Sequence, residues 1–283
     1  FPRNIVYVTS LILLMTSKRI EGEGTEYGGF YTQEEIKEVV KYAADRFITV
    51  IPELELPGHE MAAIAGYPEL SCKGEPGTPR IIWGVEDIVM CAGKEETFKF
   101  LEDVIDEIAP LFPSEDFHIG GDECPKIRWK ECPLCQKRIK EEGLKGDKQH
   151  SAEERLQSYF VQRMEKYLSG KYGKKIIGWD EILEGGLAQS ATVMSWRGEA
   201  GGIAAANMDH DVIMTPGSGG MYLDQYQGDS KIEPVTIGGY ATIEKVYSYN
   251  PIPDTLVTTG KAQHVIGVQC NNWSEYMYNT DLM

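Results

Sequence analysis

The sequence lacks several features that would assign it to a function class at once. No run of 18 or more apolar residues occurs in its 283 residues, so no transmembrane helix is expected. Basic residues are scarce, because 28 Lys and Arg face 44 Asp and Glu, for a formal net charge of −16. Polyanion binding needs clustered cations, so this balance argues against nucleic acid as a partner. Six cysteines are too few for a disulfide scaffold.

The six cysteines also fall short of a complete metal motif. Cys132 and Cys135 form a C-x-x-C, and Cys124 lies eight residues before it, but no further ligand follows until His150. Buried thiols or one local disulfide are therefore the favoured interpretation, and a zinc module at these three cysteines is the alternative. On this basis we expect no metal and no cofactor.

Helix and strand patterns alternate along the chain. Apolar residues recur at helical spacing over 32–47, 94–111 and 153–168, the first behind the capping box Thr32 to Glu35. Short apolar runs predict strands at 48–51, 117–119, 175–179, 192–196, 211–214 and 265–269. Strands that alternate with helices predict a parallel sheet in an α/β fold. With no linker of low complexity, we expect one α/β domain, and the length suits a (β/α)₈ barrel.

The segment at the start of the chain is harder to interpret. An apolar run from Ile5 to Met15 follows Arg3 and has the length of a signal-peptide core, but it lacks an initiating Met and a small-residue cleavage site. A buried strand around Ile5 to Val8 or a foreign leader are the alternatives. Residues 1–20 are left as an unassigned N-terminal segment, and 21–283 as the catalytic barrel domain.

Carboxylates or aromatic side chains follow each of the six predicted strands. In a parallel barrel the carboxyl ends of the strands meet on one face, where active sites lie. Aromatic walls with carboxylates suit a sugar, whose CH faces pack on rings while its hydroxyls bind acids. The residues in chain order are Glu53, Glu55 and His59; Asp122 and Glu123; Trp179, Asp180 and Glu181; Trp196 and Arg197; Tyr222 and Asp224; Trp273 and Glu275.

The hexapeptide His118-Ile-Gly-Gly-Asp-Glu123 carries the most chemistry. Two glycines allow close backbone approach at a strand end, and two adjacent carboxylates repel each other, so that their pKa values separate. One acid can then stay protonated while the other is ionised, as glycosidic cleavage requires. The alternative is an acidic loop at a helix N-terminus.

Several blocks together resemble glycoside hydrolase family 20, the β-N-acetylhexosaminidases. The most specific are H-I-G-G-D-E, I-P-E-L-E-L-P-G-H at 51–59 and G-W-D-E at 178–181. Shorter matches are Y-G-G-F-Y-T-Q-E-E at 27–35, Y-P-E-L-S-C at 67–72, M-S-W-R-G at 194–198, Y-L-D at 222–224 and W-S-E at 273–275. They follow the family's order over roughly residues 27 to 278.

The resemblance implies a retaining mechanism in which the 2-acetamido oxygen of the substrate attacks C1 and forms an oxazolinium intermediate. Glu123 would be the general acid and then the base that activates water. Asp122 would orient the acetamido N–H, and Tyr222 would hydrogen-bond the acetamido oxygen. His59 would lie behind Glu123 and tune its proton affinity. His118 is interpreted as structural, because strand alternation can turn it away from the pocket.

The resemblance also implies the substrate contacts. Trp179, Trp196 and Trp273 would surround the acetamido methyl and the sugar ring, and Asp224 with Glu275 would bind outer hydroxyls and make the enzyme exo-acting. The partner would be an oligosaccharide or glycoconjugate that ends in β-linked N-acetylglucosamine or N-acetylgalactosamine. The resemblance also favours a secreted, periplasmic or lysosomal location, as is usual for the family.

The sequence departs from the family's pattern at both ends. The first two strands, with the Arg that binds sugar hydroxyls, and the last helix are not recognisable, so we expect an incomplete barrel. The acidic partner expected behind His59 is also absent. Either an N-terminal piece is missing, or the chain pairs with another, self-association included, or it is a catalytically impaired glycan-binding remnant. A retaining glycosidase with a protein nucleophile is a further alternative.

Overall fold

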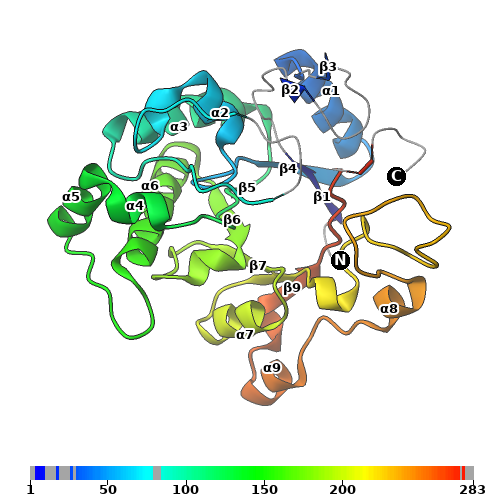
Figure 1. Cartoon of the computed structure of the whole chain (residues 1–283). Helices are drawn as coiled ribbons and strands as arrows, with labels where there is room; N and C mark the ends of the chain where they lie inside the picture. Colours follow the sequence, from blue (N-terminus) through cyan, green and yellow to red (C-terminus); the bar gives the residue numbers. More distant parts are fainter. Residues whose placement is uncertain are drawn as a thin grey trace. The chain divides into compact units, whose positions relative to one another are not determined.

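The computed structural model describes residues 30–78, 84–274 and 276–277 in full, and the backbone alone at 4–9, 17–18 and 26–27. The chain divides into two compact units, unit 1 at Phe1–Ala191 and unit 2 at Thr192–Met283. Each unit has its own strands and helices (Figure 1).

Unit 1 is built on parallel strands. β1 (Asn4–Thr9) pairs with β4 (Ile48–Glu53), β4 with β5 (Asp116–His118), and β5 with β6 (Lys175–Trp179). The last four residues of β4 are all buried, as expected of a strand covered on both faces. β1 matches the strand that the sequence allows around residues 5–8. β2 (Ser17–Lys18) and β3 (Glu26–Tyr27) form a separate antiparallel pair.

Helices follow the strands of unit 1. α1 begins at the predicted capping box, in which the Thr32 hydroxyl accepts from the Glu35 N–H and the Glu35 carboxylate accepts from the Thr32 N–H. α6 runs past the predicted end at residue 168 and ends at Gly173, whose φ of 65° suits glycine. The helices are α1 (Gln33–Ala44), α2 (Met61–Gly66), α3 (Glu95–Ile108), α4 (Ile127–Glu131), α5 (Pro133–Glu141) and α6 (Ala152–Tyr172), with 3₁₀ turns η1 (Pro68–Leu70), η2 (Ala109–Leu111) and η3 (Asp180–Leu183).

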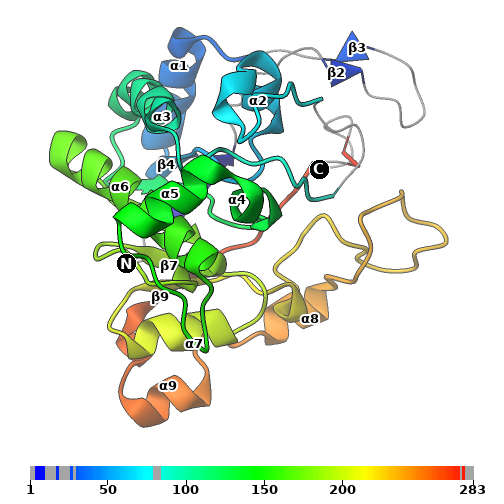
Figure 2. The ribbon, with the colours of Figure 1, turned by 60° about the vertical axis from the view of Figure 1, so that its left-hand side comes forward.

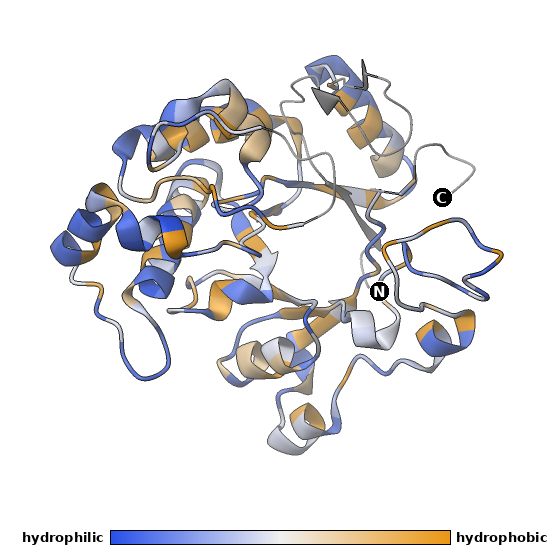
Figure 3. Cartoon of the chain, in the orientation of Figure 1, coloured by the Kyte–Doolittle hydropathy of each residue, from blue (hydrophilic) through white to orange (hydrophobic). Residues whose placement is uncertain are grey.

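The core of unit 1 lies between the strands and two long helices. α6 packs against α3 and β6, and α5 packs against both α4 and α6 (Figure 2). Phe98 of α3 meets Phe160 of α6 with ring centroids 4.7 Å apart. α1 and α3 carry both hydrophilic and hydrophobic residues (Figure 3), and their buried side chains are nearly all apolar.

Unit 2 repeats the pattern on a smaller scale. β7 (Thr192–Ser195), β8 (Val212–Met214) and β9 (Val265–Val268) are parallel neighbours in that order. α7 packs on β7 and β8, and Gly202 permits this, because a Cβ there would lie 2.6 Å from the Met214 side chain. The remaining elements are α7 (Ala200–Asn207), α8 (Ile243–Ser248), α9 (Asp254–Thr259), η4 (Gly217–Gly219) and η5 (Ala262–His264).

All six predicted strands are present, and the α/β class is confirmed. Within the described residues, no helix has the length and apolar character that crossing a bilayer demands.

Candidate active site

Two loops of unit 1 bring a histidine against two carboxylates. The loop after β4 carries His59, and the loop after β5 carries Asp122 and Glu123. His59 Nε2 lies 3.3 Å from Asp122 Oδ2 and 3.3 Å from Glu123 Oε2. The Glu123 side chain is 36% exposed and that of Asp122 is 15% exposed, so substrate can reach Glu123 while Asp122 is more enclosed.

Glycines at three positions allow the two loops to meet. A Cβ on Gly58 would lie 2.9 Å from the carbonyl oxygen of Asp122, so only glycine lets the first loop lie on the second. Gly120 and Gly121 have φ values of 63° and 99°, in the region that favours glycine. A Cβ on Gly120 would also lie 1.9 Å from Glu55 Oε2. The P-G-H and H-I-G-G-D-E motifs are therefore parts of one close contact.

The charges of this cluster are strongly coupled. Burial lowers the pKa of His59, but hydrogen bonds and attraction from Asp122 and Glu123 outweigh it and raise that pKa to about 10. Burial, together with repulsion from Asp122 and Glu53, raises the pKa of Glu55 well above its ordinary value. With a pKa of about 10, His59 is an imidazolium at neutral pH, and the raised pKa of the buried Glu55 carboxyl favours its protonated form more than in an ordinary glutamate. Protonated Glu55 can donate to Asp122, whose Oδ1 otherwise has no hydrogen-bond partner among the described residues.

A second, fully buried group lies beside β4, β5 and β6. His118 Nδ1 lies 3.0 Å from Glu53 Oε1, and the Trp179 indole N–H donates to the same oxygen at 3.0 Å. The Gly120 nitrogen also lies 3.1 Å from His118 Nδ1, so Gly120 and Glu53 compete for this ring atom. We place the imidazole proton on Nδ1, because its charge-assisted hydrogen bond to the Glu53 carboxylate is the stronger of the two. Burial raises the pKa of Glu53, but attraction to His118 and the hydrogen bonds lower it overall. Glu53 thus holds the Trp179 indole in one orientation. His118 is buried in the same group, as expected of a residue with a structural role.

Sequence reasoning missed two residues at this site. Glu60 follows His59 and is buried, and burial raises its pKa to about 8 despite attraction from His59. Gln157 of α6 donates to the Gly121 carbonyl at 2.7 Å and so supports the glycine turn. No sequence motif marks Glu60 or Gln157, because the segments that bury them are distant in the sequence. Asp180 and Glu181 are buried in η3, directly after Trp179.

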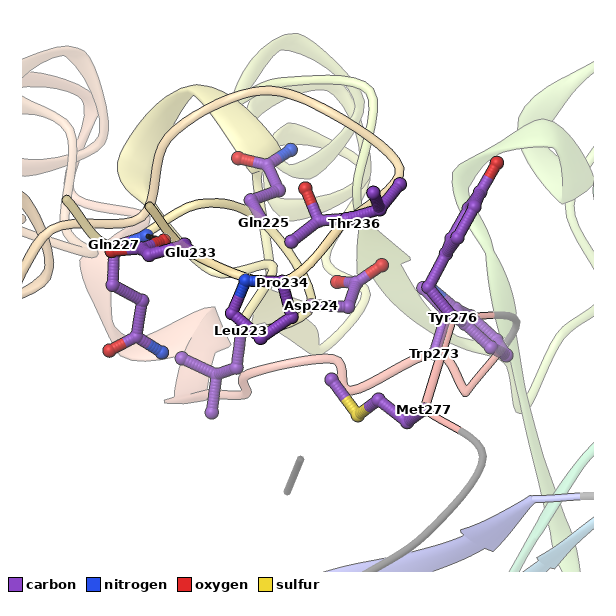
Figure 4. A pocket seen from close by; sticks show the side chains of 11 residues that line it. Leu223, Asp224, Gln225, Gln227, Glu233, Pro234, Thr236, Trp273, Tyr276 and Met277 are labelled. Atoms are coloured by element: carbon purple, nitrogen blue, oxygen red, sulfur yellow. Dashed lines mark hydrogen bonds between the residues drawn. The ribbon is translucent and has the colours of Figure 1, made fainter. Parts of the chain in front are cut away.

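Unit 2 carries the other predicted substrate contacts. Tyr222 pairs with Asn271 as a parallel β-bridge, which brings the two segments after β8 and β9 together. Asp224 and Trp273 line a pocket of about 260 Å³ with Leu223, Tyr276 and others, and the Asp224 carboxylate and the Trp273 ring both border it (Figure 4). Trp196 and Tyr222 are half-buried. Glu275 lies outside the described residues.

The structure groups the cysteines differently from the sequence pattern. Cys132 and Cys135 are free thiols and form no local disulfide. They lie with Cys72 and Cys91, while Cys124 is buried and does not belong to this group. Buried thiols, the favoured interpretation, agree with this, whereas the alternative grouping of Cys124 with Cys132 and Cys135 is not formed, because chain folding and not spacing selects the neighbours. The ligand atoms of His59, Asp122 and Glu123 also lie within 4.8 Å of one another.

Comparisons with known proteins identify the family. The sequence profile described as "Glycosyl hydrolase family 20, catalytic domain" matches residues 6–283. A beta-hexosaminidase of Porphyromonas gingivalis is 64% identical over 94% of this chain and 33% of its own length. That of Vibrio furnissii is 38% identical over 91% of this chain and 41% of its own length. The chain thus spans between a third and a half of these relatives.

Solved structures show the same fold. A β-N-acetylhexosaminidase of Bacteroides fragilis superposes with a TM-score of 0.73 at 30% identity, over 96% of this chain and 55% of that one. An exo β-N-acetylglucosaminidase of Vibrio harveyi, in complex with N-acetylglucosamine, superposes with a TM-score of 0.76 at 32% identity, over 90% and 39%. On the match of nearly the whole sequence and of the fold, the chain belongs to glycosyl hydrolase family 20.

Proposed function

We propose that this chain carries the chemistry of an exo-β-N-acetylhexosaminidase, which removes terminal β-linked N-acetylglucosamine or N-acetylgalactosamine with retention of configuration. The observation that carries the proposal is the position of His59 between the carboxylates of Asp122 and Glu123, 3.3 Å from each. Family membership and the names of the relatives support the same reaction.

In the first step Glu123 donates its proton to the glycosidic oxygen as the bond to C1 breaks. The acetamido oxygen of the same sugar attacks C1 and closes a five-membered oxazolinium ring, so the substrate supplies the nucleophile. Asp122 accepts a hydrogen bond from the acetamido N–H, and its negative charge stabilises the positive charge that develops on the ring. Glu55 is buried behind Asp122, and its raised pKa favours the protonated form, which holds the Asp122 carboxylate by a hydrogen bond.

In the second step Glu123, now a carboxylate, removes a proton from water as the water attacks C1. The ring opens, the acetamido group is restored and the β-sugar leaves. His59, whose Nε2 lies 3.3 Å from Glu123 Oε2, holds the Glu123 carboxyl in position for both steps. His59 is thus a positioning residue that acts through Glu123 and Asp122.

The family resemblance assigns the remaining substrate contacts residue by residue. Trp179, with its indole fixed by Glu53, forms one wall for the acetamido methyl, and Trp196 and Trp273 form others. Tyr222 hydrogen-bonds the acetamido oxygen and aims it at C1. Asp224, with Glu275, binds the outer hydroxyls of the terminal sugar, which restricts cleavage to chain ends.

The test is hydrolysis of an aryl β-N-acetylglucosaminide by the full chain and by two variants. Glu123→Gln should lower kcat by roughly 10²–10⁴-fold, the usual range for loss of a general acid and base. Asp122→Asn should lower kcat with a smaller effect on KM. Glu38→Gln, an exposed acid on α1, is the matched control and should leave both constants unchanged.

Two further measurements separate the rival functions. N-acetylglucosamine-thiazoline, which mimics the oxazolinium, should inhibit competitively, and an aryl β-glucoside without the acetamido group should resist cleavage. Cleavage of that glucoside without thiazoline inhibition would indicate a protein nucleophile. Thiazoline binding without turnover would leave a glycan-binding remnant and refute the enzyme proposal.

A further inference from the structure

Four cysteines far apart in the sequence meet in unit 1, away from the carboxylate cluster. The Sγ atoms of Cys72, Cys91, Cys132 and Cys135 all lie within 4.8 Å of one another. The Cys91 sulfur is 3.6 Å from that of Cys135 and 3.8 Å from that of Cys132, and Cys72 is 3.9 Å from Cys135. Three of the cysteines are buried and Cys72 is half-buried. We propose that these thiolates bind one structural zinc ion.

The spacing of the sulfur atoms suits zinc. A tetrahedral zinc with Zn–S bonds of about 2.3 Å places its sulfur atoms about 3.8 Å apart. The three sulfur separations given above, 3.6–3.9 Å, bracket that value. A disulfide requires about 2.05 Å between sulfurs, and all four cysteines are free thiols. Four thiolates in a tetrahedron select zinc or iron. Closed four-cysteine sites are typical of structural zinc, so zinc is the ion proposed here.

The backbone holds the two cysteine pairs in place. Ser71 and Met90 form an antiparallel bridge, and the Cys91 N–H donates to the Leu70 carbonyl at 2.8 Å, so Cys72 and Cys91 lie on adjoining segments. Cys132 is the N-cap of α5, and Cys135 lies in the first turn of that helix. The C-x-x-C therefore directs both sulfurs from one helix start, where the helix dipole favours thiolates.

Trp129 and Gly93 connect the two pairs. The Trp129 indole N–H donates to the Met90 carbonyl at 2.9 Å, and the Trp129 carbonyl accepts from the Cys132 N–H at 3.3 Å. A Cβ on Gly93 would lie 2.3 Å from the backbone of Leu134, so glycine is required for the segments to approach. Lys94 donates to the Ser71 carbonyl at 2.6 Å and so ties the segment after Cys91 to the residue before Cys72.

Four protein thiolates leave no coordination position for water, so the zinc is structural and not catalytic. Its ligands come from the same two connections that carry His59 and the Asp122–Glu123 pair. The metal would therefore clip the connection after β4 to the one after β5. This role is independent of the proposed hydrolase activity, because metal content is measured without substrate.

The test is the metal content of the full chain, purified without chelators and measured by inductively coupled plasma mass spectrometry. We expect about one zinc per chain, and X-ray absorption should show only sulfur neighbours at about 2.3 Å. Cys91→Ser and Cys132→Ser should each lower the zinc content at least tenfold. Cys124→Ser, at a buried cysteine outside the cluster, and Cys270→Ser should keep the zinc.

A second measurement covers the case in which the variants fail to fold. In the wild-type chain, titration of the thiols with a mercurial should release the zinc in proportion to four modified thiols. Iron in place of zinc, or no metal with the four cysteines found as disulfides by mass after alkylation, would overturn the proposal. So would zinc that persists in both Cys→Ser variants, because it would then be bound elsewhere.

Discussion

Replacement of Glu60 by Gln should stabilise the protein, and the gain should depend on pH. Glu60 precedes α2, is 8% exposed, and has a pKa raised to about 8 by burial, although His59 attracts its charge. Glutamine keeps the size of the side chain and removes its ionisation. The variant therefore isolates the cost of a buried acid next to the candidate active site.

The size of the effect follows from the two pKa values. In the unfolded chain the carboxyl titrates at 4.5 and in the folded chain at about 8, so between these pH values folding must take up a proton. The wild-type free energy of unfolding therefore falls by about 1.4 kcal/mol per pH unit over this window relative to Glu60→Gln. The variant should match the wild type below pH 4.5, gain about 3 kcal/mol at pH 7 and reach a plateau of about 5 kcal/mol above pH 8.

Urea unfolding at pH values from 4.5 to 9, followed by fluorescence, measures the difference. Glu38→Gln, an exposed acid on α1, is the control and should give a flat difference near zero. A flat difference for Glu60→Gln, or a gain largest at low pH, would refute the reasoning. Either result would mean that water or a cation reaches the carboxyl in the folded protein.

Three other substitutions separate the site from the scaffold. Gly120→Ala should abolish most hydrolysis and lower the free energy of unfolding by about 1–3 kcal/mol. The new Cβ would collide with Glu55, and a φ of 63° is strained for alanine. A normal kcat would contradict the close contact. Trp179→Phe should cost about 1–3 kcal/mol in urea unfolding, because Glu53 loses a buried donor, and an unchanged midpoint would show that the bond is unimportant. Thr32→Ala removes a cap of α1 and should cost about 0.5–2 kcal/mol with kcat and KM unchanged; altered kinetics would place α1 in catalysis.

The regular elements could be predicted from the sequence because their patterns are local. The capping box at Thr32 and the apolar stripe of α3, with Phe98, Leu101, Ile105 and Ile108 buried, appear in the structure as expected. The short helices were not predicted. α2 has six residues and α4 has five, too few for helical periodicity to rise above chance. They form in the connections between strands because of tertiary packing, which the local sequence pattern does not show.

The candidate site could be predicted only where its residues stand in local sequence motifs. Asp122, Glu123 and His59 stand in motifs, and the structure brings them together, while their roles remain proposals. No motif shows that Glu60 is buried or that the pKa of Glu55 is raised, because both properties depend on the surroundings of each carboxyl. The neighbours of Cys135 could not be found from sequence proximity, because they lie 63 and 44 residues away.

The contacts between the two loops of unit 1 explain why glycine, carboxylate and cysteine motifs occur in the same stretches. Gly58 lets the first loop lie on the backbone of Asp122, and His59 pairs with both carboxylates from that position. Gly93 lets the segment just after Cys91 approach the start of α5, where the four cysteines of the cluster meet. The charge cluster alone would hold the loops weakly, because the His59 side chain is 32% exposed and solvent screens its ion pairs. A metal clip at the cysteines would hold the same loops at a second, buried point, so that the 3.3 Å geometry of the acid cluster persists when substrate displaces water from it.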